Sequence, residues 1–194
     1  MKTQMKLFAL IILGSLFSFT KPEPADWKWD SVHSKLNFSA SHLMVSDVDG
    51  SFKDVEATIK TTKDDFSDAV VEVTAQVNSV SSGYDERDSH LKGEHFLDAA
   101  KYPAIAFKST SFKKAKEANT YTVTGNVTIH GVTKPITLIA VAKTGTNPAT
   151  NKTIAGFKIS GTLLRKDFNV GTSVPSTVVG EEITITASCE FIKN

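Results

Sequence analysis

The sequence predicts an all-β fold, an antiparallel barrel or a β-sandwich, with one short helical insert at about residues 83–102. The first observation is that apolar and polar residues alternate with period two in a series of short segments, as expected for strands with one buried face. The second is that polar residues, glycine or proline separate these segments. The third is that alanine and glycine recur on the apolar face, which therefore cannot fill a wide interior. This small-residue face favours a hollow barrel.

Eight segments carry the alternation and are expected to be strands. In chain order they are 35–41, 50–60, 69–79, 104–112, 120–130, 136–143, 154–163 and 181–192. Within the second segment, Phe52 is out of phase with Val55 and Ala57, which predicts a bulge. Polar turns between later segments predict antiparallel neighbours. Closure removes exposed strand edges, and eight strands can enclose one small ligand.

The N-terminal residues predict export. Lys2 and Lys6 precede an apolar stretch, 7–19, which has the length of a secretory signal and is too short to span a bilayer. We therefore expect a periplasmic or secreted protein. The expected divisions are a signal peptide, a flexible leader and one folded domain, at 1–20, 21–26 and 27–194.

Composition excludes several partners and anchors. The 22 Lys and Arg residues nearly balance 21 Asp and Glu residues, for a formal net charge of +1, so neither nucleic acid nor an anionic membrane is an expected partner. The single cysteine, Cys189, rules out a disulfide within the chain and lies too late to carry a lipid anchor. Its place on the apolar face of the last strand predicts an inert core thiol.

Two motifs that resemble catalytic or metal sites do not assemble into one. In "HLKGEH", His90 and Glu94 would share a helical face, but His95 would lie about 140° around the helix from His90. Ser111 and Lys114 form an S-x-x-K pair, but Ser111 ends an expected strand, whereas that nucleophile must open a helix. No metal, no cofactor and no catalytic residue is therefore expected.

Several motifs resemble the YceI-like family of polyisoprenoid-binding proteins. They are "WDSVHS" (29–34), "SHLMVSDVDGSF" (41–52), "RDSHLK" (87–92), "FLDAAKYPAIAFKST" (96–110), "GNVTIHGVTKP" (125–135), "RKDFNVG" (165–171) and "VGEEITI" (179–185). The resemblance implies a single eight-stranded, lipocalin-like antiparallel barrel, exported to the periplasm, whose apolar channel holds an isoprenoid chain such as a quinone tail or a polyprenyl phosphate. It also implies a protein without established catalytic residues and allows a homodimer. One departure is Asn169, where the family commonly has glycine; asparagine tolerates the left-handed backbone that such a turn needs.

Two groups of residues are candidates for ligand binding. The first group shares the small-residue face and is expected to line the channel: Phe38, Phe107, Val123, Ile129, Leu138, Phe157, Ile159 and Ile185. The second group offers donors for a phosphate or quinone head at the channel mouth: Arg87, His90, Lys92 and Arg165. Alternatively, Arg87 and Asp88 pin the helical insert to the barrel as a hydrogen-bonded pair.

These observations favour an exported, non-enzymatic carrier of an isoprenoid or a similar long apolar molecule, with a lipid as its partner and no membrane span. Two alternatives stay open. One is an enzyme that acts on such a ligand in the same pocket, with Asp88 and His90 as its acid-base pair. The other is a stress or surface-interaction protein with a filled core. An empty pocket of roughly 300 Å³ costs about 7 kcal/mol, so the interior is either occupied or closed by its small residues.

Overall fold

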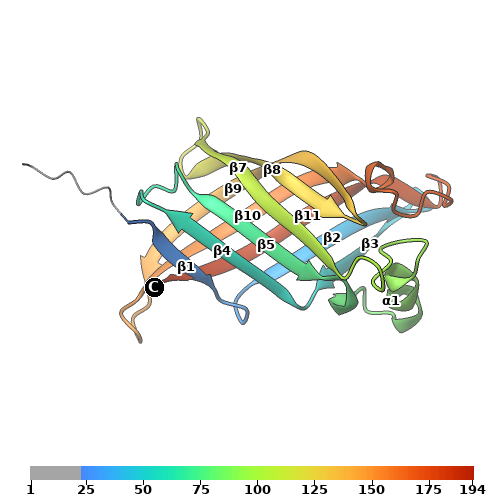
Figure 1. Ribbon diagram of the computed structural model, residues 1–194, viewed down its shortest axis with the longest axis horizontal. Coiled ribbons are helices and arrows are strands. Elements are labelled where there is room, and N and C mark those ends of the chain that lie inside the picture. The colour runs from blue at the N-terminus through green and yellow to red at the C-terminus, as the bar shows by residue number, and fades with distance from the viewer. Residues whose placement is uncertain (1–22) are drawn as a thin grey trace, which may run out of the picture.

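A computed structural model describes residues 23–194, and their fold is a closed antiparallel β-barrel (Figure 1). Its strands are β1 (Ala25–Trp29), β2 (Lys35–His42), β3 (Ser46–Phe52), β4 (Val55–Thr61), β5 (Val70–Gln76), β6 (Val80–Ser81), β7 (Ala104–Lys114), β8 (Thr120–Ile129), β9 (Val132–Thr146), β10 (Thr153–Leu164) and β11 (Val179–Lys193). The helices are α1 (Asp85–Lys92) and two 3-10 helices, Val77–Ser79 and Arg165–Phe168. Among residues 23–194, no helix combines the length and the apolarity needed to cross a bilayer.

The eleven strands occupy eight positions around the barrel, because three positions are shared by two strands each. β1 and β2 follow one another along the same edge of β11, β3 continues into β4, and β5 continues through a 3-10 turn into β6. The barrel closes through β1, which pairs with β4 on one side and with β11 on the other. The all-β, eight-stranded barrel with one helical insert that the sequence predicts is confirmed.

Two of the expected strands are interrupted in the structure. The segment expected as one strand, 50–60, is β3 and β4, separated by Lys53 and Asp54. The out-of-phase Phe52 therefore marks the end of one strand rather than a bulge within a longer one. The segment expected at 69–79 likewise leaves the sheet after Gln76 for a short 3-10 turn. The change of phase thus marks the first break, whereas Val77 keeps the phase of Val73 and Ala75 and hides the second.

The strand β1 was not expected, and it begins inside the stretch 21–26 that the sequence suggested as a flexible leader. Ala25 and Asp26 pair with Thr61 and Lys60 of β4, which places them in the wall of the barrel. Charged and proline residues hide this short strand in the sequence. The expected signal peptide, 1–20, lies outside the described residues.

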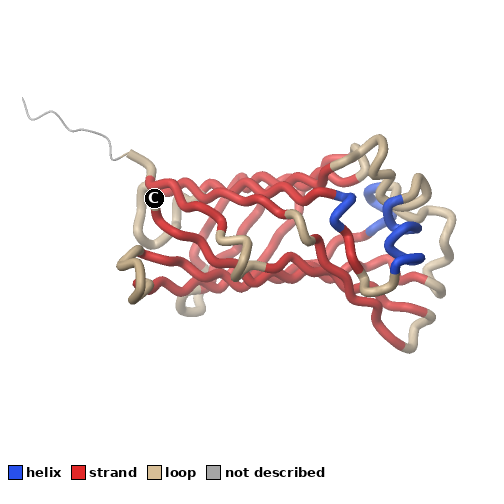
Figure 2. Tube along the Cα trace, turned by 90° about the horizontal axis from the view of Figure 1, so that it is seen from below, coloured by secondary structure: helices blue, strands red, loops and turns tan. Residues whose placement is uncertain are grey.

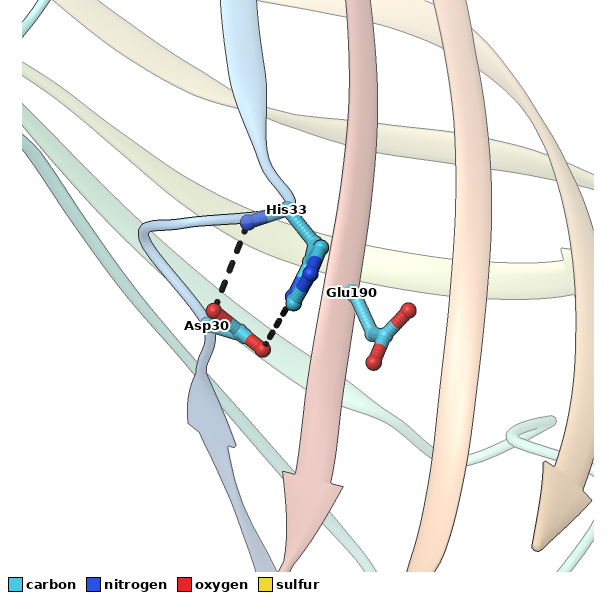
Figure 3. Close-up of side chains that lie close together, drawn as sticks. All are labelled: Asp30, His33 and Glu190. Atoms are coloured by element: carbon cyan, nitrogen blue, oxygen red, sulfur yellow. Dashed lines mark hydrogen bonds and ion pairs between the residues drawn. The ribbon is translucent and has the colours of Figure 1, made fainter. Parts of the chain in front are cut away.

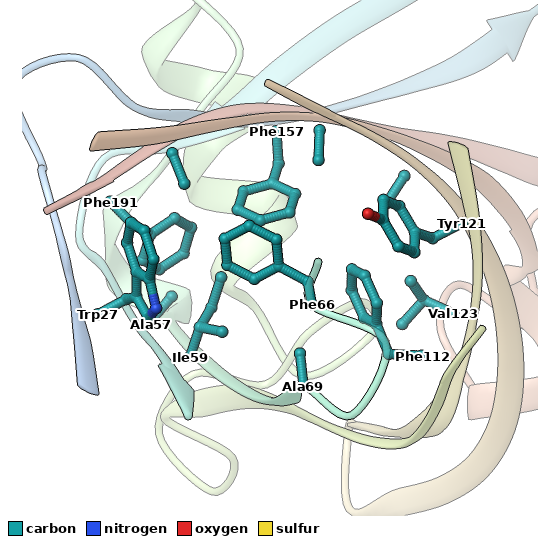
Figure 4. Close-up of a cluster of buried hydrophobic side chains, with 13 residues drawn as sticks. Trp27, Ala57, Ile59, Phe66, Ala69, Phe112, Tyr121, Val123, Phe157 and Phe191 are labelled. Atoms are coloured by element: carbon teal, nitrogen blue, oxygen red, sulfur yellow. The ribbon is translucent and has the colours of Figure 1, made fainter. Parts of the chain in front are cut away.

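One end of the barrel is plugged by the loop between β4 and β5. Phe66 in this loop is 1% exposed, and its ring centroid lies 5.2 Å from those of Trp27 and of Phe157 (Figure 4). Asp68 holds the loop closed by accepting a hydrogen bond from the hydroxyl of Thr61, which lowers the pKa of this carboxyl to about 2. This end of the barrel is therefore filled by aromatic side chains.

The opposite end of the barrel carries α1 and the loop between β10 and β11. Figure 2 shows the helices gathered at this end, with the strands forming the long walls between the two ends. The segment that follows α1 is hydrogen-bonded to the loop between β10 and β11: the amide of Gly171 in that loop donates to the carbonyl of His95. One end of the barrel thus carries the loop between β4 and β5, and the other carries α1 and the loop between β10 and β11.

Small residues on the inner face make room for large side chains of neighbouring strands. A Cβ at Gly125 would lie 2.5 Å from the Phe107 ring and 2.6 Å from the carbonyl oxygen of Lys108. Gly50 makes the same close approach to the ring of Phe38. Because these rings lie against glycines in the wall, they do not have to extend across the barrel axis.

Candidate ligand-binding site

An apolar cavity of about 170 Å³ lies inside the barrel. Residues from almost every strand line it: Trp29, Leu36, Asn37, Phe38, Phe52, Val55, Ala57, Ile59, Val71, Val73, Ala75, Ile105, Phe107, Phe112, Val123, Val127, Ile129, Ile136, Leu138, Phe157, Ile159, Leu163, Ile185, Ala187, Cys189 and Phe191. All except Asn37 and Cys189 are aliphatic or aromatic. The cavity therefore offers dispersion contacts and burial, and almost no hydrogen bonds, to whatever it holds.

The residues nominated from the small-residue face all line this cavity. They are Phe38, Phe107, Val123, Ile129, Leu138, Phe157, Ile159 and Ile185. The nomination missed the contribution of β3, β4 and β5, although Val55, Ala57 and Ile59 alternate as clearly as any residues in the chain. Strand pairing, which puts β4 beside β5 and β5 beside β7, brings these side chains to the same cavity.

The one cysteine is part of the cavity wall. Burial raises the pKa of the Cys189 thiol to about 12, so the thiol stays protonated at neutral pH. Cys189 faces Phe157 on β10 and serves the cavity as a small apolar group. This placement agrees with the inert thiol expected from the sequence.

A second, outer pocket of about 420 Å³ lies at the end of the barrel that carries α1. The hairpin of β2 and β3, the α1 insert and the start of β11 surround it, through Phe38, Ala40, Ser41, His42, Val48, Tyr84, Glu86, Arg87, His90, Leu91, Phe96, Val178 and Val179. Phe38 lines both this outer pocket and the inner cavity, and its ring lies 5.8 Å from that of Phe52. Phe38 therefore lies between the apolar inner cavity and the outer pocket, which has both apolar and polar residues in its wall.

Two of the four nominated mouth residues line the outer pocket, and two do not. Arg87 and His90 face it from α1, whereas Lys92 and Arg165 line neither space. The guanidinium of Arg87 donates to the hydroxyl of Ser82 at 2.7 Å and to its carbonyl at 3.0 Å.

The insert is pinned through Ser82 rather than through a direct pair of Arg87 and Asp88. The buried carboxylate of Asp88 accepts from the Ser82 amide at 2.7 Å and from its hydroxyl at 2.5 Å. These bonds, the hydroxyl first, lower the pKa of Asp88. His90 lies two residues further along α1 and faces the outer pocket, so Asp88 and His90 do not form the acid-base pair of the enzyme alternative.

Arg165 is a structural residue at the same end of the barrel. It is 3% exposed, and its side chain donates to the carbonyl oxygens of Val170, Gly171, Val174, Val179 and Gly180. Every N–H of the guanidinium is used, so none remains for a ligand head group. Arg165 instead ties the loop between β10 and β11 to the barrel. In the same loop Asn169 has a φ of 59°, which is the left-handed backbone expected at a position where the family commonly has glycine.

Asp30 and His33, in the connection between β1 and β2, cluster with Glu190 of β11, and the side chains offer atoms of the kinds that bind metals within 4.8 Å of one another (Figure 3). Asp30 already accepts hydrogen bonds from the ring of His33 at 2.8 Å and from the amide of Val32 at 2.9 Å. The Asp30 amide donates to the Glu190 carbonyl, and Ser34 bonds to the backbone of Glu190. These hydrogen bonds hold the connection between β1 and β2 against β11.

A closed antiparallel barrel with an apolar cavity on its axis defines a lipocalin-like class of protein, in which the wall encloses space for one ligand. Within that class, the chain belongs to the family of the YceI-like domain, whose sequence profile matches residues 27–191. The resemblance drawn from the sequence motifs is thereby confirmed.

Known proteins resemble the chain over most of its length. The protein YceI of Salmonella newport is 37% identical over 190 residues, which are 96% of this chain and 97% of the relative. The crystal structure of BcnA from Burkholderia cenocepacia superposes with a TM-score of 0.74 at 26% identity, over 84% of this chain and 98% of that one. A polyisoprenoid binding domain from Saccharophagus degradans, implicated in plant cell wall breakdown, shares the fold with a TM-score of 0.64 at 13% identity, over 87% of this chain and 98% of that one.

Proposed function

We propose that the protein is an exported, non-enzymatic carrier of a long apolar molecule, with an isoprenoid chain such as a quinone tail or a polyprenyl phosphate as its ligand. The observation that carries the proposal is the inner cavity, whose wall is almost entirely aliphatic and aromatic. The name of the polyisoprenoid binding domain that shares this fold supports the same ligand class. The apolar N-terminal stretch, 7–19, supports export.

The sizes of the two spaces indicate how such a ligand lies. The inner cavity, at about 170 Å³, is smaller than the roughly 300–1,000 Å³ of usual ligand sites. With the outer pocket of about 420 Å³ it reaches that range. A long chain would therefore place its tail in the inner cavity, pass Phe38 and leave its head among the polar residues of the outer pocket.

Burial supplies the affinity in this proposal. Each buried carbon contributes about 0.8 kcal/mol, so a five-carbon isoprene unit contributes up to roughly 4 kcal/mol before the cost of ordering the chain. Affinity would then depend on chain length, and head-group chemistry would add selectivity. The cavity also speaks against the alternative of a filled core.

The proposal is tested by loading the purified protein with a long-tailed quinone from vesicles, followed by gel filtration, organic extraction and mass spectrometry. Ala187 lines the cavity and Ser188 points outward on the same strand, so Ala187→Phe and Ser188→Phe form a matched pair. The wild type and Ser188→Phe are expected to retain the quinone intact, and Ala187→Phe to lose at least about 90% of it, because the new ring fills the space. A wild type that takes up no quinone, or an Ala187→Phe variant that carries as much, would refute the proposal. A chemically altered quinone would favour the enzyme alternative.

A further inference from the structure

The tip of the β2–β3 hairpin exposes three consecutive apolar side chains. Leu43, Met44 and Val45 are 49%, 72% and 84% exposed. Three residues join His42 to its strand partner Ser46, and they contain a β-turn in which the amide of Val45 donates to the carbonyl of His42 at 3.2 Å. Both central residues of this turn have positive φ, 52° for Leu43 and 59° for Met44. Such a turn normally carries Asn-Gly, because large side chains are strained in the left-handed region.

This strain has no packing explanation in the fold. The other non-glycine residues with positive φ in the described part of the chain are Phe66, Asp98, Asn119, His130, Asn151 and Asn169. Of these, Phe66 is the one apolar residue, and it is buried as the plug of the barrel. Leu43 and Met44 keep a strained backbone while their side chains face solvent. Strained residues that packing does not require point to a function for the side chains they display.

The tip lies beside the mouth of the binding site. Its strands, β2 and β3, run toward the end of the barrel that carries α1 (Figure 1). The amide of Leu43 donates to the carbonyl of Val178, which lines the outer pocket, and Tyr84 on the same rim is 56% exposed. Along β2, Ala40 lines the outer pocket and Phe38 lines both spaces. A molecule that arrives at the tip thus reaches the cavity along the inner side of one hairpin.

We propose that this tip inserts into the surface of a lipid bilayer and sets the mouth of the barrel against it, so that ligand passes directly between bilayer and cavity; this inference rests on the proposed carrier function. A bilayer fits the tip better than a protein does, because three side chains expose far less than the roughly 800 Å² per partner of a stable protein interface. The nearest charges in the chain, Asp47 and Asp49, are acidic, so the surface is expected to be electrically neutral, such as phosphatidylcholine.

The first test is flotation of the full chain with phosphatidylcholine vesicles, comparing the wild type with the double variant Leu43→Asn, Met44→Gly. Asn-Gly suits this turn, so the double variant is expected to melt at the same temperature as the wild type or higher, and misfolding is not an explanation for lost binding. Its partition to vesicles is expected to fall at least tenfold, about the effect of withdrawing one large apolar side chain. Added anionic lipid is expected to bring no increase.

Every full-chain variant keeps the apolar stretch 7–19, and flotation does not report which part of the chain touches the vesicle. A second measurement therefore locates the contact. Met44→Trp and Val32→Trp each place an indole at an exposed apolar position, Val32 lying away from the mouth in the β1–β2 connection. Brominated phosphatidylcholine is expected to quench the tryptophan at 44 and to leave the one at 32 unchanged. Equal flotation of wild type and double variant, or equal quenching at both positions, overturns the proposal. So does sedimentation showing a wild-type dimer that the double variant lacks, because the tip is then covered by a second copy.

Uptake of a short-tailed quinone from solution separates this proposal from the carrier function. The double variant is expected to bind it as the wild type does, since the cavity is untouched, but to take a long-tailed quinone from vesicles at least about tenfold more slowly. If the wild type binds neither quinone, the carrier function fails and the bilayer role falls with it. If it binds both and the two proteins load from vesicles at equal rates, the carrier function stands and the tip proposal fails.

Discussion

At the scale of single residues, the inner wall of the barrel depends on small residues placed beside large ones. The eight residues nominated from alternation all lie in the cavity wall, because strand geometry puts every second side chain on the same face. The reason for the glycines was not visible, since it depends on which residue lies opposite on the next strand. The role of Arg165 was hidden for the same reason: its five carbonyl partners are brought to it by the folded loop.

Gly125→Ala is expected to destabilise the protein by about 1–3 kcal/mol, because the added methyl meets both the Phe107 ring and the backbone carbonyl of Lys108. Gly145 is the control, since a Cβ there meets nothing within 4 Å. Gly145→Ala is expected to leave stability unchanged or slightly raised. Urea unfolding of both variants measures the difference, and equal midpoints for the two would refute this account of the wall.

His33→Gln is expected to lower the melting temperature in a pH-dependent way. The hydrogen bond that His33 donates to Asp30, and then the charge of Asp30, raise the pKa of His33 above 6.5, and the same bond lowers the pKa of Asp30 below 3.8. The histidine's contribution to stability is present below about pH 6.5 and lost as pH rises through its raised pKa, while that of Asp30 is lost as pH falls through its lowered pKa. The melting deficit should be largest near pH 5.5 and smaller near pH 8.5. The same deficit at both values, or a pH-dependent deficit in the control His90→Gln, would contradict this assignment.

At the scale of elements, the sequence predicts the long strands and fails at their interruptions and ends. β7 to β11 appear where alternation placed them; β8 ends one residue earlier than expected, and the other four extend beyond the expected bounds. β1 was missed, because its five residues are too few for their alternation to stand out beside the prolines that precede them, and they are held by pairing with β4 and β11. Phe66 was also missed, because it lies in a loop, where periodicity carries no information. Both ends of the barrel are therefore products of tertiary contacts.

Arg165→Lys tests whether the hydrogen bonds of Arg165 hold the loop between β10 and β11 in place. A lysine has three donors in place of five, so buried carbonyls lose their partners, and the variant is expected to lose at least about 2 kcal/mol of stability. Limited proteolysis should cut within residues 169–178 faster than in the wild type. Quinone bound per folded molecule should stay the same, because Arg165 lines neither pocket. A variant of normal stability with impaired ligand binding would instead make Arg165 a head-group residue.

At the scale of the whole molecule, a closed wall surrounds a space that the protein does not fill itself. One end is plugged by aromatic side chains, and the outer pocket lies at the other end, beside α1. A vacant cavity of about 170 Å³ forgoes about 4 kcal/mol of packing energy, a large part of the roughly 5–15 kcal/mol by which a domain is stable. The fold thus favours an occupied interior.

Removal of any bound lipid is therefore expected to lower the melting temperature, and a long-tailed quinone is expected to restore it. Protein extracted with detergent, with and without added quinone, is compared by scanning calorimetry. In Ala187→Phe the quinone is expected to have no such effect, since the ring occupies the cavity. A wild type whose melting temperature is the same empty and loaded would show that the interior does not need an occupant.

The most direct measurement is the affinity of the wild type for a series of prenyl alcohols that differ only in the number of isoprene units. The account predicts that affinity rises with each added unit, by at most roughly 4 kcal/mol per unit, until the chain fills the inner cavity and outer pocket, and then levels off. An affinity independent of chain length, or no binding at any length, would contradict the claim that the barrel holds an apolar chain.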